Sequence, residues 1–259
     1  MRARTRLLAT AVAALLGCVA AEARAEDQST DLQPFDKLRI EGCFDARLEP
    51  GTPARAVVSA TSDQLQSIRV EQDGKRVRIG FVRKEDYGSL CRGPPIRVSI
   101  TASFSAGDSV DLGIAGSGSL DANVPRAAKL AGALAGAGRI ALRGAAADCT
   151  LTLAGSGTAD GSALACDSSA KVAVRGSGSA KLGGRTNSCA FVIDGSGGVT
   201  TDGLECDSAD VTINGSGSVV LAMVASLKVQ INGSGNVKYR GQPKLNGAAI
   251  NGSGRLIQE

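Results

Sequence analysis

The sequence predicts an all-β protein built as a parallel β-helix (solenoid), and three observations support this prediction. A Gly-Ser-Gly triplet, replaced once by Gly136-Ala137-Gly138, recurs at steps of 18 to 21 residues. Apolar and polar residues alternate on both sides of each triplet. Glycine accounts for 34 of 259 residues and tryptophan is absent, so the core must be built from small aliphatic side chains. The triplets begin at Gly116, Gly136, Gly155, Gly176, Gly195, Gly215, Gly233 and Gly252.

The alternation beside the triplets predicts which residues face inward. Positions two before, four before and four after the first glycine are mostly apolar, and the residues between them are polar or small. This pattern predicts two strands per repeat, each with one buried face. One repeat cannot bury that face alone, so coils of about 20 residues must stack about 4.8 Å apart. The column two before the triplets contains Ile114, Leu134, Leu153, Val174, Ile193, Ile213, Ile231 and Ile250.

Residues 1–25 have the features of a secretory signal peptide. Three arginines precede an apolar stretch, and Ala23-Arg24-Ala25 fits a small-x-small cleavage site. A second interpretation is a lipoprotein signal, because Leu15-Leu16-Gly17-Cys18 resembles a lipobox that would leave a lipid anchor on Cys18. Both interpretations predict export to the periplasm or cell surface, or secretion. No other apolar run has the roughly 20 residues needed to span a bilayer.

Removing the signal peptide also removes most of the positive charge. Residues 1–25 contain four arginines and one glutamate, so 29 basic and 25 acidic residues become 25 and 24. A chain this close to neutral gives no electrostatic case for binding nucleic acid, which requires a concentrated basic face.

The remaining chain is expected to form one domain after a short linker at residues 26–34. Within residues 35–256, the segment 35–110 is expected to supply a β-rich N-terminal cap and the first coils, and 111–256 the triplet array. Asp73-Gly74 between two short apolar runs predicts a hairpin. Residues 256–259 leave little chain for a second cap, so that edge is expected to be exposed or paired with a partner, which would allow oligomers.

Six cysteines remain after cleavage: Cys43, Cys91, Cys149, Cys166, Cys189 and Cys206. An even number in an exported chain predicts disulfides. The separation is 17 residues both from Cys149 to Cys166 and from Cys189 to Cys206. Coils of about 20 residues would place each of these pairs on adjacent coils, which leaves Cys43 to pair with Cys91. Coils of about 40 residues would instead pair Cys149 with Cys189 and Cys166 with Cys206.

The residue types argue against several kinds of chemistry. The chain has no histidine, so Ser196 has no histidine base to make it a protease-like nucleophile, and a zinc site would need four scattered thiolates. The triplets lie between strands and not at a strand-to-helix junction, which argues against phosphate loops. Calcium-binding β-helices repeat at nine residues, and Asp121 and Asp160 are isolated. We therefore expect no catalytic residue, metal or cofactor.

Polysaccharide cleavage would require clustered carboxylates. Asp160, Asp167, Asp202 and Asp207 are the residues that could lie near one another, because Cys166-Asp167-Ser168 recurs as Cys206-Asp207-Ser208. Solvated loop aspartates are the simpler interpretation.

Stacking also predicts two polar ladders along the turn edge. Both are explained by stabilisation of the turns, and both could also form a flat polar strip that contacts a glycan or protein. The turn serines are Ser117, Ser156, Ser177, Ser196, Ser216, Ser234 and Ser253, and the residues just before the last turns are Asp194, Asn214, Asn232 and Asn251.

The array resembles a known bacterial family. Phe35-Asp36-Lys37-Leu38 opens into strands, serial Gly-Ser-Gly turns follow, and the segments 233–243 and 251–254 close the pattern. This is similar to the putative auto-transporter adhesin, head GIN domain family over about residues 35–256. The resemblance implies a right-handed β-helix of pectin-lyase-like shape without catalytic residues, a surface or periplasmic location, and an adhesion role. The six cysteines are not typical of the pattern.

Two functions follow as hypotheses. One is a non-enzymatic adhesion or cell-envelope interaction module, whose partner would be an envelope glycan or surface protein. The other is a β-helix protein that binds or cleaves polysaccharide. The absence of tryptophan and the scarcity of tyrosine count against the second, because sugar sites commonly use aromatic platforms.

Overall fold

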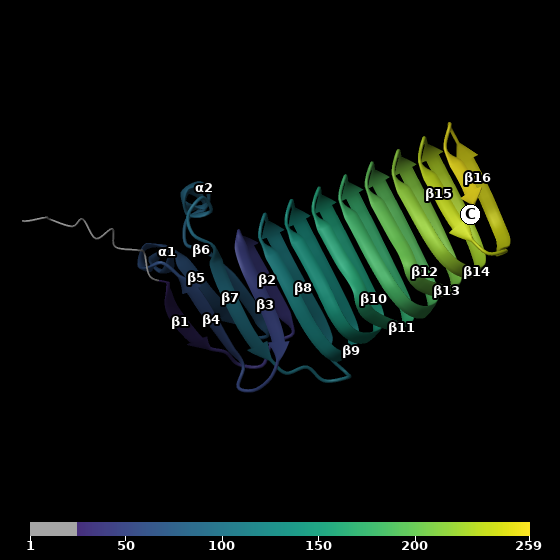
Figure 1. The fold of residues 1–259 in the computed structure, drawn as a ribbon. Helices are drawn as coiled ribbons and strands as arrows, with labels where there is room; N and C mark the ends of the chain where they lie inside the picture. Colours follow the sequence, from purple (N-terminus) through teal and green to yellow (C-terminus); the bar gives the residue numbers. More distant parts are fainter. Residues whose placement is uncertain (1–24) are drawn as a thin grey trace, which may run out of the picture.

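The computed structural model describes residues 25–259. The predicted signal peptide, apart from its last residue, and Cys18 lie outside the described residues. Strands account for 74% and helices for 5% of the residues, which confirms the all-β prediction. Figure 1 shows the strands stacked side by side along one axis, with three short helical segments confined to the N-terminal end.

The N-terminal elements are β1 (Glu26–Asp31), β2 (Lys37–Gly42), β3 (Phe44–Pro50), β4 (Arg55–Ala60), α1 (Ser62–Gln66), β5 (Ile68–Asp73), β6 (Arg76–Phe81), η1 (Lys84–Asp86), α2 (Tyr87–Leu90) and β7 (Ile96–Ala102). The repeat array contains β8 (Ser109–Gly116), β9 (Ser119–Gly136), β10 (Arg139–Gly155), β11 (Thr158–Gly176), β12 (Ser179–Gly195), β13 (Gly198–Gly215) and β14 (Ser218–Gly233). The chain ends with β15 (Asn236–Arg240), β16 (Lys244–Asn251) and β17 (Arg255–Gln258).

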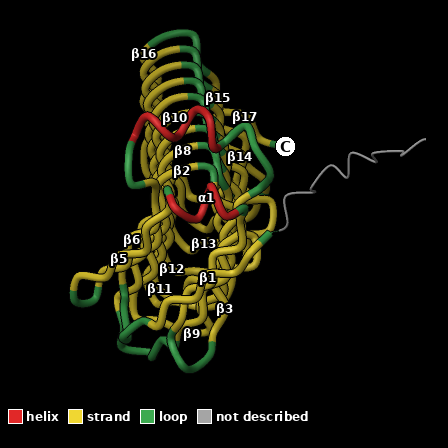
Figure 2. Tube along the Cα trace, turned by 90° about the vertical axis from the view of Figure 1, so that its left-hand side faces the viewer, coloured by secondary structure: helices red, strands yellow, loops and turns green. Residues whose placement is uncertain are grey.

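The array is a parallel β-solenoid with about 8 turns spaced about 20 residues apart. Leu153 pairs in register with Leu134 of the preceding coil and with Val174 of the following coil. Every step from β8 to β14 is parallel. A coil of about 40 residues is therefore excluded. Figure 2 views the stack from its N-terminal end, and the turns lie one behind another along one edge.

Each full coil is a single bent strand, and the expectation of two strands per repeat was wrong. β9 to β14 each run from one triplet to the next over 16 to 19 residues. Register shifts interrupt the pairing partway, for example between Ala146 and Asp148 on β10. Because each bend lies on the bend of its neighbour, the ladder of backbone hydrogen bonds resumes after it and the strand is not broken.

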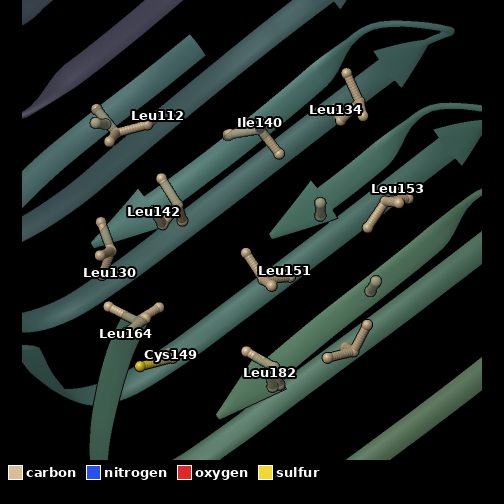
Figure 3. Packing of buried hydrophobic residues seen from close by; sticks show 14 of the residues in the cluster. Leu112, Leu130, Leu134, Ile140, Leu142, Cys149, Leu151, Leu153, Leu164 and Leu182 are labelled. Atoms are coloured by element: carbon tan, nitrogen blue, oxygen red, sulfur yellow. The ribbon is translucent and has the colours of Figure 1, made fainter. Parts of the chain in front are cut away.

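Aliphatic columns fill the interior. Ile114, Leu134, Leu153 and Ile213 are all at most 2% exposed. Figure 3 shows Leu134 and Leu153, and likewise Ile140 and Leu142, pointing into the space enclosed by the coils. Thr201 is a buried exception, and its hydroxyl donates to the Val220 carbonyl at 3.0 Å. The predicted inward columns are confirmed for the internal coils.

The first glycine of each turn is required by the stacking of the coils. Gly155 has φ +123°, and a Cβ there would lie 2.4 Å from the Gly136 carbonyl oxygen of the preceding turn. An L-residue would therefore meet both an unfavourable φ and a backbone clash. The turn itself is held by the same oxygen, which accepts hydrogen bonds from the N–H groups of Ser156 and Gly157 at 3.0 and 3.1 Å.

The N-terminal segment does not follow chain order along the axis. β2 lies between β6 and β8, and β3 lies between β7 and β9, all in parallel pairing. The antiparallel strand β5 pairs with β6, and β4 and β1 extend the sheet beyond β7. Residues 26–31, expected to be part of a linker, instead form β1, because they complete the edge of β4. The predicted hairpin at Asp73-Gly74 joins β5 to β6.

The other end of the stack is open in the described residues. All eight residues of β16 are exposed, including Leu245 at 49% and Ile250 at 40%. Ile250 occupies the same column as the fully buried Ile213. It is more exposed because no coil covers it within the described chain.

Candidate functional site

The turn serines do not form a continuous chain of hydroxyl hydrogen bonds. Ser234 and Ser253 have hydroxyls 3.0 Å apart, and the Ser117 hydroxyl lies 3.2 Å from the Tyr87 hydroxyl. Within the part of the chain that the structure describes, these are the two hydrogen bonds between side chains that involve turn serines. The remaining turn hydroxyls, on Ser156, Ser177, Ser196 and Ser216, are exposed along the turn edge.

The residues just before the turns do form a chain of hydrogen bonds, which we call the amide ladder. Asn214 Nδ2 donates to Asp194 Oδ1 at 2.8 Å, Asn232 Nδ2 to Asn214 Oδ1 at 2.9 Å, and Asn251 Nδ2 to Asn232 Oδ1 at 3.1 Å. All the donors point toward the N-terminal end, where the carboxylate of Asp194 accepts the last bond. Each bond therefore polarises the next in the same direction.

The amide ladder retains hydrogen-bonding capacity. An asparagine side chain has two N–H donors and an oxygen with two lone pairs. One donor and one lone pair of Asn214 and of Asn232 are used along the ladder. The second donor and second lone pair of each residue are free to point outward from the edge, repeating at about 4.8 Å.

Three disulfides are present, with the pairings that the cysteine spacing predicts. Cys149 is bonded to Cys166 and Cys189 to Cys206, with Cα–Cα distances of 5.7 and 6.1 Å, and Cys43 is bonded to Cys91. The members of a pair are not register partners, because Cys149 lies beside Ala170 and Cys166 beside Ala146. The first two bridges are buried inside the solenoid, with all four cysteines at most 4% exposed.

The aspartates that could have formed a cleavage site are each engaged with a different cation. Asp167 lies 3.3 Å from Arg126, Asp207 lies 3.8 Å from Arg185, and Asp202 lies 4.0 Å from Arg240. Among the described residues, no cluster of three histidine, cysteine, aspartate or glutamate side chains could hold a metal ion. The structure therefore does not bring these carboxylates together as a catalytic group.

The carboxyl of Asp160 has a lowered pKa. Hydrogen bonds from the Ser162 hydroxyl and backbone N–H, at 2.7 and 3.1 Å, lower the pKa of the carboxyl below its ordinary value. Arg139, 3.9 Å away, acts in the same direction. A carboxyl that stays ionised cannot act as a general acid near neutral pH.

Sequence reasoning missed a recess at the N-terminal end of the turn edge. It has a volume of about 310 Å³ and is lined by Glu41, Gly42, Phe81, Tyr87 and Ala115. Gly42 pairs in register with Gly116, so residues 42–44 form an earlier turn in the same stack. That turn has cysteine and phenylalanine in place of serine and glycine, which hid it from the triplet pattern.

A larger hollow on the array has a volume of about 360 Å³ and is formed by neighbouring residues of β11, β12, β13 and β14. It is lined mainly by small side chains such as Ser188 and Ser208. Their hydroxyls are used by backbone carbonyls of the preceding coil, and the nearby Lys228 lies 3.8 Å from Asp210. The hydroxyls of Ser188 and Ser208 are therefore already engaged, while Lys171 and Asn246, which also line the hollow, are exposed.

The chain is similar to known proteins in both sequence and structure. The family model described as putative auto-transporter adhesin, head GIN domain matches residues 34–182 and 168–243. No curated protein matches significantly. A crystal structure described as a putative lipid binding protein from Parabacteroides distasonis is similar with a TM-score of 0.75 and 21% identity, covering 92% of this chain and 98% of the other.

Two further crystal structures support the same fold. A putative adhesin from Parabacteroides merdae has a TM-score of 0.75 at 15% identity, covering 92% of this chain and 97% of that one. A putative adhesin from Bacteroides fragilis has a TM-score of 0.60 at 15% identity, covering 91% and 97%. At these identities the likeness establishes the fold.

Proposed function

Because the chain belongs to the putative auto-transporter adhesin, head GIN domain family, we propose that it is an exported, non-enzymatic adhesion module of the bacterial cell envelope. The observation that carries this proposal is the amide ladder on a rigid solenoid edge. The ladder fixes donors and acceptors in one line without catalytic groups beside it. Such a line suits an extended polar partner, either an envelope glycan or a surface protein.

Export is supported by two independent features. The signal-peptide pattern precedes β1, and the three disulfides require an oxidising compartment such as the periplasm or the cell surface. Among the described residues, no helix is both long and apolar enough to cross a membrane. Mass spectrometry of the protein from a cell envelope fraction tests this directly. A fully oxidised chain starting at Glu26 is expected, a diacylglyceryl-modified Cys18 would identify the lipoprotein form, and a reduced chain starting at Met1 would contradict export.

The alternative function is polysaccharide binding or cleavage by the same fold. Cleavage is disfavoured because Asp160, Asp167 and Asp207 are held apart by separate partners. Binding without cleavage is compatible with an adhesion module. Release of reducing or unsaturated sugar ends from acidic polysaccharides, abolished by Asp167→Ala or Asp207→Ala, would establish an enzyme instead.

Adhesion is tested with the oxidised mature chain immobilised on beads and bacterial cells or isolated envelopes as the partner. The double variant Asn214→Ala/Asn232→Ala removes the centre of the amide ladder. The matched control, Thr212→Ala/Gln230→Ala, changes outward residues two positions earlier on the same strands. We expect the ladder variant to lose retention of cells while the control keeps it, with equal circular dichroism. Equal retention by both variants would exclude the ladder as the contact surface.

A further inference from the structure

Four cations are packed together on the outer face of the N-terminal sheet. β2 and β6 run side by side, and their register pairs Lys37 with Arg76 and Arg39 with Arg78. We call these four residues the cationic block. Like charges on directly paired strand positions are destabilising. A stable fold tolerates such an arrangement where another group makes use of the charge.

Neighbouring carboxylates compensate only half of the cationic block. Arg39 donates two hydrogen bonds to Asp111, at 3.1 and 3.0 Å, and Arg78 lies 3.7 Å from Glu41. Asp73 pairs in register with Arg76 across the β5–β6 hairpin, yet neither Arg76 nor Lys37 has an ion pair within 4 Å among the described residues. Both side chains are exposed. The block therefore offers two uncommitted cations beside two partly neutralised ones.

The aromatic recess adjoins the block. Glu41 lines the recess and also two polar hollows, one containing Arg69 and Arg78 and the other containing the whole block. Phe81, at the end of β6, and Tyr87 form one wall, with ring centroids 6.2 Å apart in an edge-on arrangement. Both rings are partly exposed, whereas Phe44 behind Phe81 is fully buried.

The recess is held rigid from several sides. The Tyr87 hydroxyl lies 3.2 Å from the hydroxyl of Ser117, the first turn serine. The Cys43–Cys91 disulfide ties the end of α2 to the turn between β2 and β3. A side chain at Gly42 would collide with Phe44, with Cβ 2.5 Å from the ring, so glycine allows the Phe44 and Phe81 rings to pack against the backbone of this turn. Preorganised aromatic walls with a few polar groups are typical of sites for small ligands or single residues of a polymer.

We propose that this face binds an acidic saccharide. One sugar ring of the saccharide would lie against Tyr87 and Phe81, and the anionic groups of the same saccharide chain would contact the cationic block. The inference rests on the proposed function in that it names the class of ligand for an adhesion module. A sugar ring has an apolar face that suits the partly exposed rings of Phe81 and Tyr87, and its hydroxyls can donate hydrogen bonds to the Glu41 carboxylate. Carboxylate or sulfate groups on the same chain match Lys37 and Arg76, the cations without ion pairs. Nucleic acid fits less well, because the mature chain outside this block is net acidic, with 21 basic residues (25 minus 4) and 24 acidic residues.

Calorimetric titration of the oxidised mature chain tests the proposal with three probes: hyaluronan hexasaccharide (carboxylate), a heparin hexasaccharide (sulfate) and neutral maltohexaose. We expect at least one acidic probe to bind, with maltohexaose much weaker. Lys37→Gln/Arg76→Gln should weaken binding by roughly tenfold or more, as expected for loss of charge-assisted hydrogen bonds. Its charge-matched control is Lys171→Gln/Lys181→Gln, which removes two exposed lysines from the array and should change affinity less than about twofold.

The aromatic half of the proposal has its own readout. Tyr87→Ala should weaken binding comparably, Tyr87→Phe should retain it, and Phe104→Ala, a partly buried ring packed on Phe35, should have no effect. The chain has two tyrosines and no tryptophan, and Tyr239 is only 9% exposed, so ligand-induced tyrosine fluorescence changes report on Tyr87. They should disappear in Tyr87→Phe.

Three results would overturn the inference: no acidic probe binds, the control pair weakens binding as much as the block pair, or Tyr87→Ala binds normally. The bead assay separates this inference from the adhesion proposal. If no acidic probe binds while the beads still retain cells and the ladder variant does not, the proposed function stands and the saccharide site is wrong. If saccharide binds but cells are not retained by any form, the adhesion proposal fails on its own.

Discussion

Replacing isoleucine by alanine at two positions of one column tests how the solenoid is stabilised. Ile213 is 0% exposed and lies between Ile193 and Ile231 of the adjacent coils. Alanine removes three carbons, which is worth about 2.4 kcal/mol in transfer free energy before any cavity is counted. The whole change should therefore destabilise the protein by about 2–5 kcal/mol. Ile250 has the same place in the last coil but is 40% exposed, so its replacement should cost about 1 kcal/mol.

The assay is guanidinium unfolding of the oxidised mature chain, followed by circular dichroism at pH 7. With a slope of about 5 kcal/mol per molar, a loss of about 3 kcal/mol lowers the midpoint by about 0.6 M. Ile250→Ala should lower the midpoint by about 0.2 M. Ser216→Ala should lower the midpoint by no more than about 0.2 M, because the Ser216 hydroxyl lies on the exposed turn edge. Equal shifts for Ile213→Ala and Ile250→Ala would refute the reasoning, because they would mean that burial by a following coil does not set the cost.

Three other predictions follow from the same stacking. Non-reducing peptide mapping should recover Cys149 joined to Cys166, and replacing both by serine should cost about 3 kcal/mol for their separation of 17 residues; recovery of Cys149 joined to Cys189 would contradict the coil length. Gly155→Ala should lower the free energy of unfolding by more than about 1 kcal/mol, since φ is +123° and a Cβ would meet a backbone oxygen at 2.4 Å, and an unchanged free energy of unfolding would argue against close turn stacking. Asp160→Asn should destabilise the protein at pH 7. Since the folded-state pKa of Asp160 lies below 3.8, its contribution is present above that pH and is lost as the pH falls through the lowered value, so the two proteins should converge in acid; a constant difference between them would contradict the assignment.

The array could be predicted from sequence because its constraints are periodic. Each coil repeats the same inward positions, so the step from Gly136 to Gly155 gives both the coil length and the burial of Leu153. The disulfide pairing could be predicted from the coil length alone. Which residues lie directly beside the cysteines could not be predicted, since the register shift between Ala146 and Asp148 lies just before Cys149.

The N-terminal end could not be predicted in the same way. β6 and β7 come after β2 and β3 in the chain but lie outside them in the stack, and nothing periodic encodes that order. The turn at Gly42 lacks the serine and the second glycine of the triplet. β1 has no apolar alternation because both of its faces are largely exposed, so its pairing with β4 is invisible in the sequence.

The same contrast indicates where ligand specificity can arise in such a fold. Within the array, stacking fixes the inward columns and the turn glycines, and neighbouring outward residues are matched to one another, as in the amide ladder. A group with chemistry of its own is easiest to place where a neighbouring coil imposes no partner. The segment between β3 and β8 is such a place, since its strands pair out of chain order and its helices η1 and α2 lie beside the stack of strands. It supplies Arg76, Arg78, Phe81 and Tyr87, while β2 contributes Lys37, Arg39 and Glu41. In the proposal made here, the array provides length, and the residues that contact the saccharide lie at its N-terminal end.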